Sequence, residues 1–283
     1  MVPLRAALVD AARRLAEAGV PAARHDAEAL AAHVIGCSRG DLLVRTEIDS
    51  DEYEALIIRR AEREPLQHLT GRAYFRHVEL EVGPGVFIPR PETEVLAGWV
   101  IDRLNRDAPP APVVVDLCTG SGAVALAVAT EVPGAVVHAV ELDERAYGWA
   151  LRNLAGTGVH LVHGDLADAF GELDATVDVV AANPPYIPLD AWESVDPEVR
   201  DHDPGAALWA EGDGLAIVRQ VERTAARLLR PGGVVAVEHA DAQAVSAPDV
   251  FTATGAWHEV RDHLDLAGRS RFVTATRVVD AAR

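Results

Sequence analysis

Four consecutive residues in the second half of the chain have the types needed to hold a planar amino group. Asn183-Pro184-Pro185-Tyr186 come directly after the apolar run 177–182. The two prolines fix the local backbone and supply no N–H donors, so their carbonyl oxygens can point towards a ligand. The Asn183 side chain adds a further acceptor, and the Tyr186 ring offers a flat apolar face. Two acceptors and an aromatic plane are suited to an NH2 group. The alternative interpretation is a rigid turn after a strand.

A second segment, 116–122, has the composition of a cofactor-binding turn. Its sequence Asp-Leu-Cys-Thr-Gly-Ser-Gly follows an apolar run and opens an expected helix, and its glycines let a ligand approach the backbone closely. Glu141, at the end of the next expected strand, can accept hydrogen bonds from ribose hydroxyls. The glycine spacing, continued by Ala125, also nearly matches a dinucleotide fingerprint, which is the alternative. Asp116 would repel a diphosphate but attract the amino group of S-adenosylmethionine, so the pattern favours a methyl donor.

Methyl transfer to an amide nitrogen is chemistry that these two segments could support together. An amide nitrogen is a poor nucleophile because its lone pair is delocalised into the carbonyl group. Fixing both N–H bonds, with a methyl sulfonium in line, favours pyramidalisation and adds a proximity effect worth ~7–11 kcal/mol at best. No strong general base is needed beforehand, since the methylated nitrogen becomes acidic and then loses its proton.

The elements that would position these residues alternate between strands and helices from about residue 112 onward. The expected strands are 113–115, 135–140, 159–162, 177–182 and 233–237. This pattern predicts an α/β fold with a doubly wound, mainly parallel sheet that binds ligands at the carboxyl ends of its strands. The stretch 188–212 interrupts the alternation, and a loop of that length in a compact domain is usually functional.

The chain before residue 93 has a different organisation. The first ~75 residues show helical spacing, with stops at Gly19 and Gly36 and an N-cap at Ser50 or Asp51, so we expect a small all-α bundle. Residues 74–82 then alternate with period two, and a turn at 83–85 followed by a return strand predicts a β-hairpin. The predicted parts are a helical domain over 1–73, a hairpin linker over 74–92 and the α/β domain over 93–283.

The composition excludes several classes of protein. With 283 residues, 49% of them hydrophobic and 25% charged, the chain can build a sizeable core. Its net charge is −18 and it contains no lysine, so it lacks the broad basic surface of a nucleic-acid binder. No apolar run reaches the ~18 residues of a membrane span. Two cysteines and no signal-peptide core predict a cytoplasmic protein, and the scattered histidines predict no metal site.

Several segments together resemble the HemK-type protein-(glutamine-N5) methyltransferases, which modify peptide chain release factors. Besides 116–122 and 183–186, the matching segments are 65–71 with Phe75, 87–94, 207–208 with 213–215, and 265–271. The match covers about residues 65–273. DNA adenine methyltransferases share only the Asn-Pro-Pro-Tyr part, so the combination is specific.

The resemblance implies a class I methyltransferase fold with a seven-stranded sheet, joined to the helical domain by the β-hairpin. It implies methyl transfer from S-adenosyl-L-methionine to the N5 amide nitrogen of the glutamine in a Gly-Gly-Gln motif, leaving S-adenosyl-L-homocysteine. The helical domain would contact the release factor. The implied catalytic residues are Asn183, Pro184, Pro185 and Tyr186. The implied cofactor-binding residues are Phe87, Arg90, Thr93, Cys118, Thr119, Gly120, Ser121, Gly122, Glu141, Leu142, Asp165, Leu166 and Asn183.

The chain departs from the family pattern in three places. Cys118 stands where many relatives have glycine, and a small side chain tolerated in the loop is the interpretation we favour. Ala210-Glu211 replaces a Gly-Gly pair, and 238–240, Glu-His-Ala, replaces Glu-x-Gly. We expect the last two departures to lie outside the cofactor and amide sites, and to affect loop geometry and substrate choice.

Alternatives to a release factor substrate remain. A sister enzyme could methylate a glutamine of a ribosomal protein, and the helical domain and the 188–212 loop would decide between them. An adenine-N6 methyltransferase of nucleic acid would use the same clamp, but the charge of −18 argues against it. A non-enzymatic adaptor is the third alternative. We expect a monomer that contacts neither nucleic acid nor membrane directly.

Overall fold

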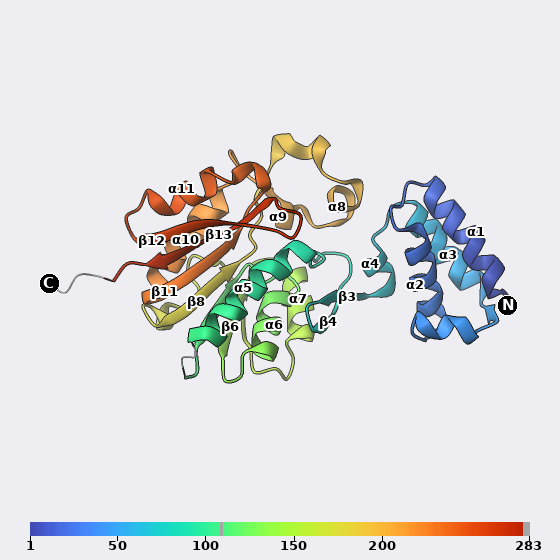
Figure 1. Cartoon of the computed structure of the whole chain (residues 1–283), viewed down its shortest axis with the longest axis horizontal. Helices are drawn as coiled ribbons and strands as arrows, with labels where there is room; N and C mark the ends of the chain where they lie inside the picture. The colour runs from blue at the N-terminus through green and yellow to red at the C-terminus, as the bar shows by residue number, and fades with distance from the viewer. Residues whose placement is uncertain (108–109, 280–283) are drawn as a thin grey trace. The chain divides into compact units, whose positions relative to one another are not determined.

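The computed structural model describes residues 1–107 and 110–279, which form two compact units (Figure 1). A helical unit consists of 1–72, 82–84 and 195–202, and an α/β unit contains the other described residues. No helix in the described ranges is long and apolar enough to cross a membrane. The predicted domain boundaries after residues 73 and 92 stay predictions.

The helical unit is built from amphipathic helices around buried leucine and isoleucine side chains, among them Leu15, Leu30 and Ile57. Gly36 ends the second helix in the left-handed conformation, as expected, at φ 70°. The N-cap of the third helix is Asp49, whose carboxylate accepts from two backbone N–H groups, and not Ser50 or Asp51. The elements of this unit are β1 Val2–Pro3, α1 Leu4–Glu17, α2 Ala23–Ile35, η1 Gly40–Val44, β2 Glu47–Ile48, α3 Ser50–Ala61, α4 Leu66–Thr70 and α8 Pro197–His202.

A buried ionic cluster joins α8 to the helices α2 and α3. Arg60 is only 4% exposed; its Nε donates to Asp26 at 2.8 Å and its Nη2 donates to Glu198 at 2.8 Å. Arg63 donates from Nε to the same Glu198 oxygen at 2.9 Å. A buried guanidinium needs such partners, because an unpaired charge away from water is costly. These ion pairs therefore account for the inclusion of 195–202 in the helical unit.

The α/β unit contains the expected mainly parallel sheet of seven strands. Its order is β12-β13-β11-β8-β5-β6-β7, and β13 runs antiparallel to both of its neighbours. The strands are β5 Val113–Leu117, β6 Val136–Glu141, β7 His160–His163, β8 Val177–Ala182, β11 Leu229–Glu238, β12 Trp257–Leu264 and β13 Ser270–Arg277. The predicted fold class is confirmed.

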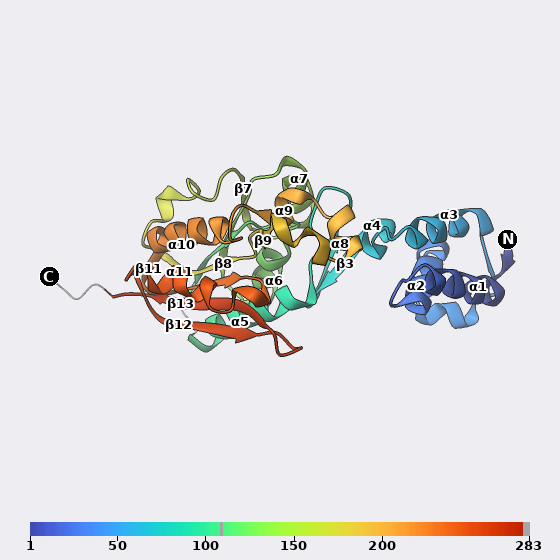
Figure 2. The same cartoon turned by 90° about the horizontal axis from the view of Figure 1, so that it is seen from above.

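Helices pack on both faces of this sheet. The central strands β5 and β8 have consecutive buried residues, so both of their faces are apolar. Val115 and Leu117 of β5 share a buried cluster with Val218 and Val221, which lie on α10. The helices of the unit are α5 Pro91–Asp107, α6 Ala123–Glu131, α7 Glu144–Asn153, α9 Gly205–Leu208, α10 Ala216–Leu228 and α11 Ser246–Thr252. Figure 2 shows the same elements from above.

The hairpin expected between the helical and α/β parts is present, but the prediction of its turn was wrong. Strands β3 Arg72–Phe75 and β4 Val78–Glu81 pair with each other, so the turn falls at Arg76-His77 and not at 83–85. Arg76 has a left-handed φ of 51°, and its guanidinium donates to both carboxylate oxygens of Glu131 at 2.7 and 2.6 Å. This fork to α6 stabilises a turn that contains neither glycine nor proline.

The stretch 188–212 contains short elements instead of a single irregular loop. They are β9 Ile187–Pro188, η3 Leu189–Ser194, α8, α9 and β10 Trp209–Ala210, and β9 pairs with β10 in parallel. The pairing brings residues 187 and 209 together, so the chain leaves the α/β unit after β9 and returns to it before the neighbouring strand β10.

We expect Glu198→Ala to destabilise the helical unit by about 2–4 kcal/mol, because it leaves the buried Arg60 short of one partner. Hydrogen exchange of the amides of α2 and α3 measures this loss. Glu54→Ala is the matched control, because it removes an ion pair with Arg14 in which the Glu54 side chain is 50% exposed. This change should cost less than about 1 kcal/mol. Equal losses in the two variants would contradict the assignment of Glu198 to the buried cluster.

Candidate active site

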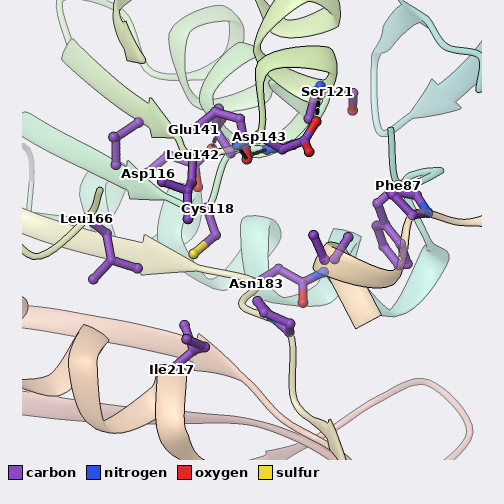
Figure 3. A pocket seen from close by; sticks show the side chains of 18 of the residues that line it. Phe87, Asp116, Cys118, Ser121, Glu141, Leu142, Asp143, Leu166, Asn183 and Ile217 are labelled. Carbon is purple, nitrogen blue, oxygen red and sulfur yellow. Dashed lines mark hydrogen bonds between the residues drawn. The ribbon is translucent and has the colours of Figure 1, made fainter. Parts of the chain in front are cut away.

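A cavity of about 640 Å³ lies at the carboxyl ends of β5, β6 and β8 (Figure 3). The chain leaves β5 for β6 and β7 on one side and later returns to place β8 on the other. Such a reversal of strand order separates the connecting loops and leaves a crevice where ligands bind. The predicted segments 116–122 and 183–186 leave β5 and β8 at this point.

The turn 118–122 forms one wall of the cavity. Cys118, Gly120 and Gly122 all have left-handed backbones, with φ of 62°, 58° and 87°. A Cβ atom on Gly122 would come within 3.0 Å of Leu154 Cγ, so a larger residue would disturb the packing of the turn as well as its backbone. Figure 3 shows the Cys118 sulfur directed into the cavity, with Asn183 across from it.

Asp116 holds this turn to the start of α6. The residue is 2% exposed, and its Oδ2 accepts from the Thr119 hydroxyl at 2.6 Å and from the Ala125 N–H at 3.1 Å. Burial raises the pKa of Asp116 to about 7, and the two hydrogen bonds oppose that rise. Asp116 is also one of the residues that line the cavity. The attraction of an ammonium group to Asp116 stays a prediction.

Glu141 lies at the end of β6 and spans two backbone segments. One carboxylate oxygen accepts from the Gly120 N–H at 2.8 Å and the other accepts from the Asp143 N–H at 2.9 Å. Burial raises the pKa of Glu141, although these N–H groups favour its ionised form. A carboxylate has about four lone-pair sites, so Glu141 keeps acceptor capacity on the cavity side.

Most of the predicted cofactor residues line this cavity, and their roles stay predictions. Those that line it are Phe87, Thr93, Cys118, Thr119, Gly120, Ser121, Glu141, Leu142, Asp165, Leu166, Asn183 and, from the predicted catalytic set, Pro185. The lining does not include Arg90, Gly122, Pro184 or Tyr186. Gly122 caps α6. The Arg90 guanidinium lies 5.2 Å from the centre of the Phe87 ring and pairs with the buried Asp203.

A buried carboxylate behind the Asn-Pro-Pro-Tyr segment connects its two polar side chains. Asn183 donates from Nδ2 to the Thr93 hydroxyl at 3.1 Å, and that hydroxyl donates to Glu238 at 2.7 Å. The Tyr186 hydroxyl donates to the other Glu238 oxygen at 2.9 Å. The expectation that the last two departures lie outside the cofactor and amide sites was wrong. Ala210 and Glu211 both line the cavity. In the 238–240 segment, Glu238 is hydrogen-bonded to Tyr186, although this glutamate is shared with the Glu-x-Gly pattern.

Sequence reasoning also missed two residues from the 188–212 stretch. Asp203 binds Arg90 and accepts weakly from the Ile88 N–H at 3.5 Å, which ties the 87–90 segment to the start of α9. Trp209 lines the cavity and stacks at a tilt on Trp192, with ring centres 5.0 Å apart. An acidic or aromatic residue within a long loop of a compact domain was the available signal. No group of three or more potential metal-ligating side chains occurs among residues 1–107 and 110–279.

The sheet order and the cavity at its switch point define a methyltransferase of class I fold. The family "Methyltransferase small domain" matches residues 84–193, and "PrmC N-terminal domain" matches residues 6–71. The solved structure of the T. thermophilus 16S rRNA N2 G1207 methyltransferase, in complex with AdoMet and guanosine, is similar in fold. It is 22% identical with a TM-score of 0.52, over 73% of this chain and 49% of that one.

Curated relatives identify the family more narrowly. The release factor glutamine methyltransferase of Streptomyces coelicolor is 55% identical over 277 residues, 98% of this chain and 99% of the relative. The chain belongs to the release factor glutamine methyltransferase family, and the predicted resemblance is confirmed. A 4-amino-L-phenylalanine/4-methylamino-L-phenylalanine methyltransferase of Streptomyces pristinaespiralis is 45% identical, over 90% of this chain and 89% of that protein.

We expect the Cys118 thiol to react slowly although it faces the cavity. Burial, with smaller contributions from Glu141 and Asp116, raises the pKa of Cys118 well above its ordinary value. Only the thiolate is nucleophilic, and each unit of pKa lowers its fraction tenfold. Alkylation at pH 8, followed by peptide mass spectrometry, should be at least ~10-fold slower at Cys118 in the folded protein than in the urea-unfolded protein. Equal rates would contradict the burial argument.

Proposed function

We propose that the protein transfers a methyl group from S-adenosyl-L-methionine to the N5 amide nitrogen of the glutamine in the Gly-Gly-Gln motif of peptide chain release factors. The observation that carries this proposal is the position of Asn183, which faces the turn 118–122 across one cavity (Figure 3). Membership of the release factor glutamine methyltransferase family supports the same substrate.

The cavity lining is suited to S-adenosylmethionine, which would supply an electrophilic methyl group when bound. Glu141 has acceptor capacity for ribose hydroxyls, and Leu142, Leu166 and Ile217 offer apolar surface for the adenine ring. The turn 118–122 would hold the methionine part close to the backbone. Phe87 would place an aromatic face near the sulfonium, where a cation is favoured. S-adenosyl-L-homocysteine would be the product.

The residues beyond the turn would orient the substrate amide. Since Asn183 donates through Nδ2 to Thr93, its Oδ1 is left to accept one N–H of the glutamine side chain. The Pro184 carbonyl would accept the other, and Tyr186 would pack on the amide plane. Holding both hydrogens favours the pyramidal nitrogen of the transition state. The methylated amide would then lose its proton without a dedicated base.

A small aromatic amine is the second candidate acceptor. A relative at 45% identity is named for methylation of 4-amino-L-phenylalanine. Two aromatic side chains, Phe87 and Trp209, line the cavity of this chain. An aryl NH2 group is also planar and has two N–H bonds, so the same acceptors could hold it. A glutamine of a ribosomal protein and the N6 amino group of adenine also present a planar NH2 group to these acceptors.

The remaining properties are part of the same proposal. We propose that the protein acts as a monomer in the cytoplasm and contacts neither nucleic acid nor membrane. The net charge of −18 supports the absence of nucleic-acid binding, because phosphate contacts require basic side chains. A reducing compartment is proposed because the chain has only two cysteines, Cys37 and Cys118, which are too few for a disulfide framework.

We expect Asn183→Ala to reduce kcat for the Gly-Gly-Gln glutamine about 100-fold or more, because one of the two amide acceptors is lost. Binding of S-adenosyl-L-homocysteine should change less than about 3-fold, since the turn 118–122 and Glu141 are untouched. Steady-state kinetics with a release factor and calorimetry with the product measure the two effects. Unchanged turnover would contradict the amide clamp. A kcat/KM for 4-amino-L-phenylalanine above that for the release factor would favour the second candidate.

A further inference from the structure

Glu238 is a buried acid that the methyl-transfer chemistry does not itself require. It ends β11, is 1% exposed, and both of its carboxylate oxygens are hydrogen-bonded to side chains. The two donors come from distant parts of the chain: Thr93 from α5 and Tyr186 from the segment that follows β8. A buried carboxylate that costs desolvation energy and contacts the active-site segment suggests a positioning role.

The direction of each hydrogen bond between Glu238, Thr93 and Asn183 follows from the ionised state of the Glu238 carboxylate. A carboxylate only accepts, so the Thr93 hydroxyl must donate its single proton to Glu238. The hydroxyl oxygen is then left to accept, and the group that faces it is the Asn183 side chain at 3.1 Å. Asn183 must therefore turn its NH2 group towards Thr93. Its carbonyl oxygen is left for the acceptor site.

We propose that Glu238 is a positioning residue that sets, through the Thr93 hydroxyl, which end of the Asn183 amide is presented to the methyl acceptor. The inference rests on the proposed function, in which the substrate NH2 group needs an oxygen acceptor. If the Asn183 amide is reversed, its NH2 group faces an N–H of the substrate, and the substrate loses one of its two acceptors.

Protonation of Glu238 should reverse the order of donors and acceptors. A protonated carboxyl can donate to the Thr93 hydroxyl, which can then donate to Asn183 and favour the reversed amide. The surroundings make this titration accessible: burial raises the pKa of Glu238 to about 7, and Glu92 on α5 contributes to the rise. Arg271 on β13 and the hydroxyls of Thr93 and Tyr186 oppose it.

The sign of the pH effect follows from these groups. The competent form is the ionised one, so kcat should increase as the pH rises through about 7. The folding contribution has the opposite direction, because the folded pKa lies above the unfolded value. That contribution is present below the unfolded pKa and is lost as the pH rises through the folded one. A rise in activity therefore cannot come from improved folding by this group.

The first test compares Glu238→Gln with wild type and with Glu222→Gln. Glutamine keeps the shape but can accept only at one end, so we expect kcat to fall about 10- to 100-fold with cofactor affinity within about 2-fold. Glu222 is a matched control, because it is a buried glutamate that accepts from Trp257 at 2.7 Å and Thr254 at 3.0 Å, away from the cavity lining. Its variant should keep kcat within about 2-fold of wild type.

Two further variants test whether the loss of kcat comes through the Thr93 hydroxyl and not from general damage to the fold. Thr93→Val keeps the shape without the hydroxyl and should reproduce the loss, whereas Thr93→Ser keeps the hydroxyl and should retain activity within about 3-fold. Wild type should show the rising limb of kcat near pH 7, and Glu238→Gln should lack it. Wild-type activity in Glu238→Gln, or the same limb in both proteins, would overturn the proposal.

A measurement without any methyl acceptor distinguishes this inference from the proposed function. In protein labelled at asparagine side chains, the Nδ2 hydrogens of Asn183 should be protected from exchange in wild type bound to S-adenosyl-L-homocysteine. The resonance is assigned by its loss in Asn183→Asp. Protection should persist in Glu222→Gln and disappear in Glu238→Gln. Persistent protection in Glu238→Gln would overturn the inference even if no release factor were methylated. Loss of protection would support it whatever the acceptor is.

Discussion

A side-chain amide has two N–H hydrogens and a delocalised lone pair, so a site that methylates it must surround it with oriented acceptors. This constraint accounts for the polar architecture behind the Asn-Pro-Pro-Tyr segment. Prolines remove backbone donors, and the Asn183 amide is turned by its bond to Thr93 so that oxygen is left over. The buried Glu238 accepts in turn from the Thr93 hydroxyl and is the last acceptor in this series of hydrogen bonds. Each of these features reduces the number of N–H groups near the substrate nitrogen.

The same principle of buried acids at strand ends recurs on the cofactor side of the cavity. Asp116 accepts hydrogen bonds from a side-chain hydroxyl and a backbone N–H, and Glu141 accepts from two backbone N–H groups. Burial raises the pKa values of both acids. These carboxylates hold the left-handed turn 118–122 in place, because they accept from the Thr119 hydroxyl and the Gly120 N–H within it.

The sequence predicted the parts of this architecture that depend on local pattern. The strand–turn–helix around Asp116, the stop at Gly36 and the strand before Asn183 are all set by neighbours within a few residues. The turn at Arg76 was missed because it depends on a fork to Glu131, which lies 55 positions away. Glu238 was placed outside the site because its partner Thr93 is 145 positions away. Contacts of that range follow from the strand order, which a single sequence does not reveal.

The most direct test of the central claim is to locate the methyl group. The purified protein is incubated with labelled S-adenosylmethionine and an equimolar mixture of a release factor, ribosomal proteins, duplex DNA and 4-amino-L-phenylalanine, and the products are examined by mass spectrometry. We expect label on the side-chain nitrogen of the Gly-Gly-Gln glutamine. Label found only on a ribosomal protein, on adenine or on the aromatic amine would contradict it.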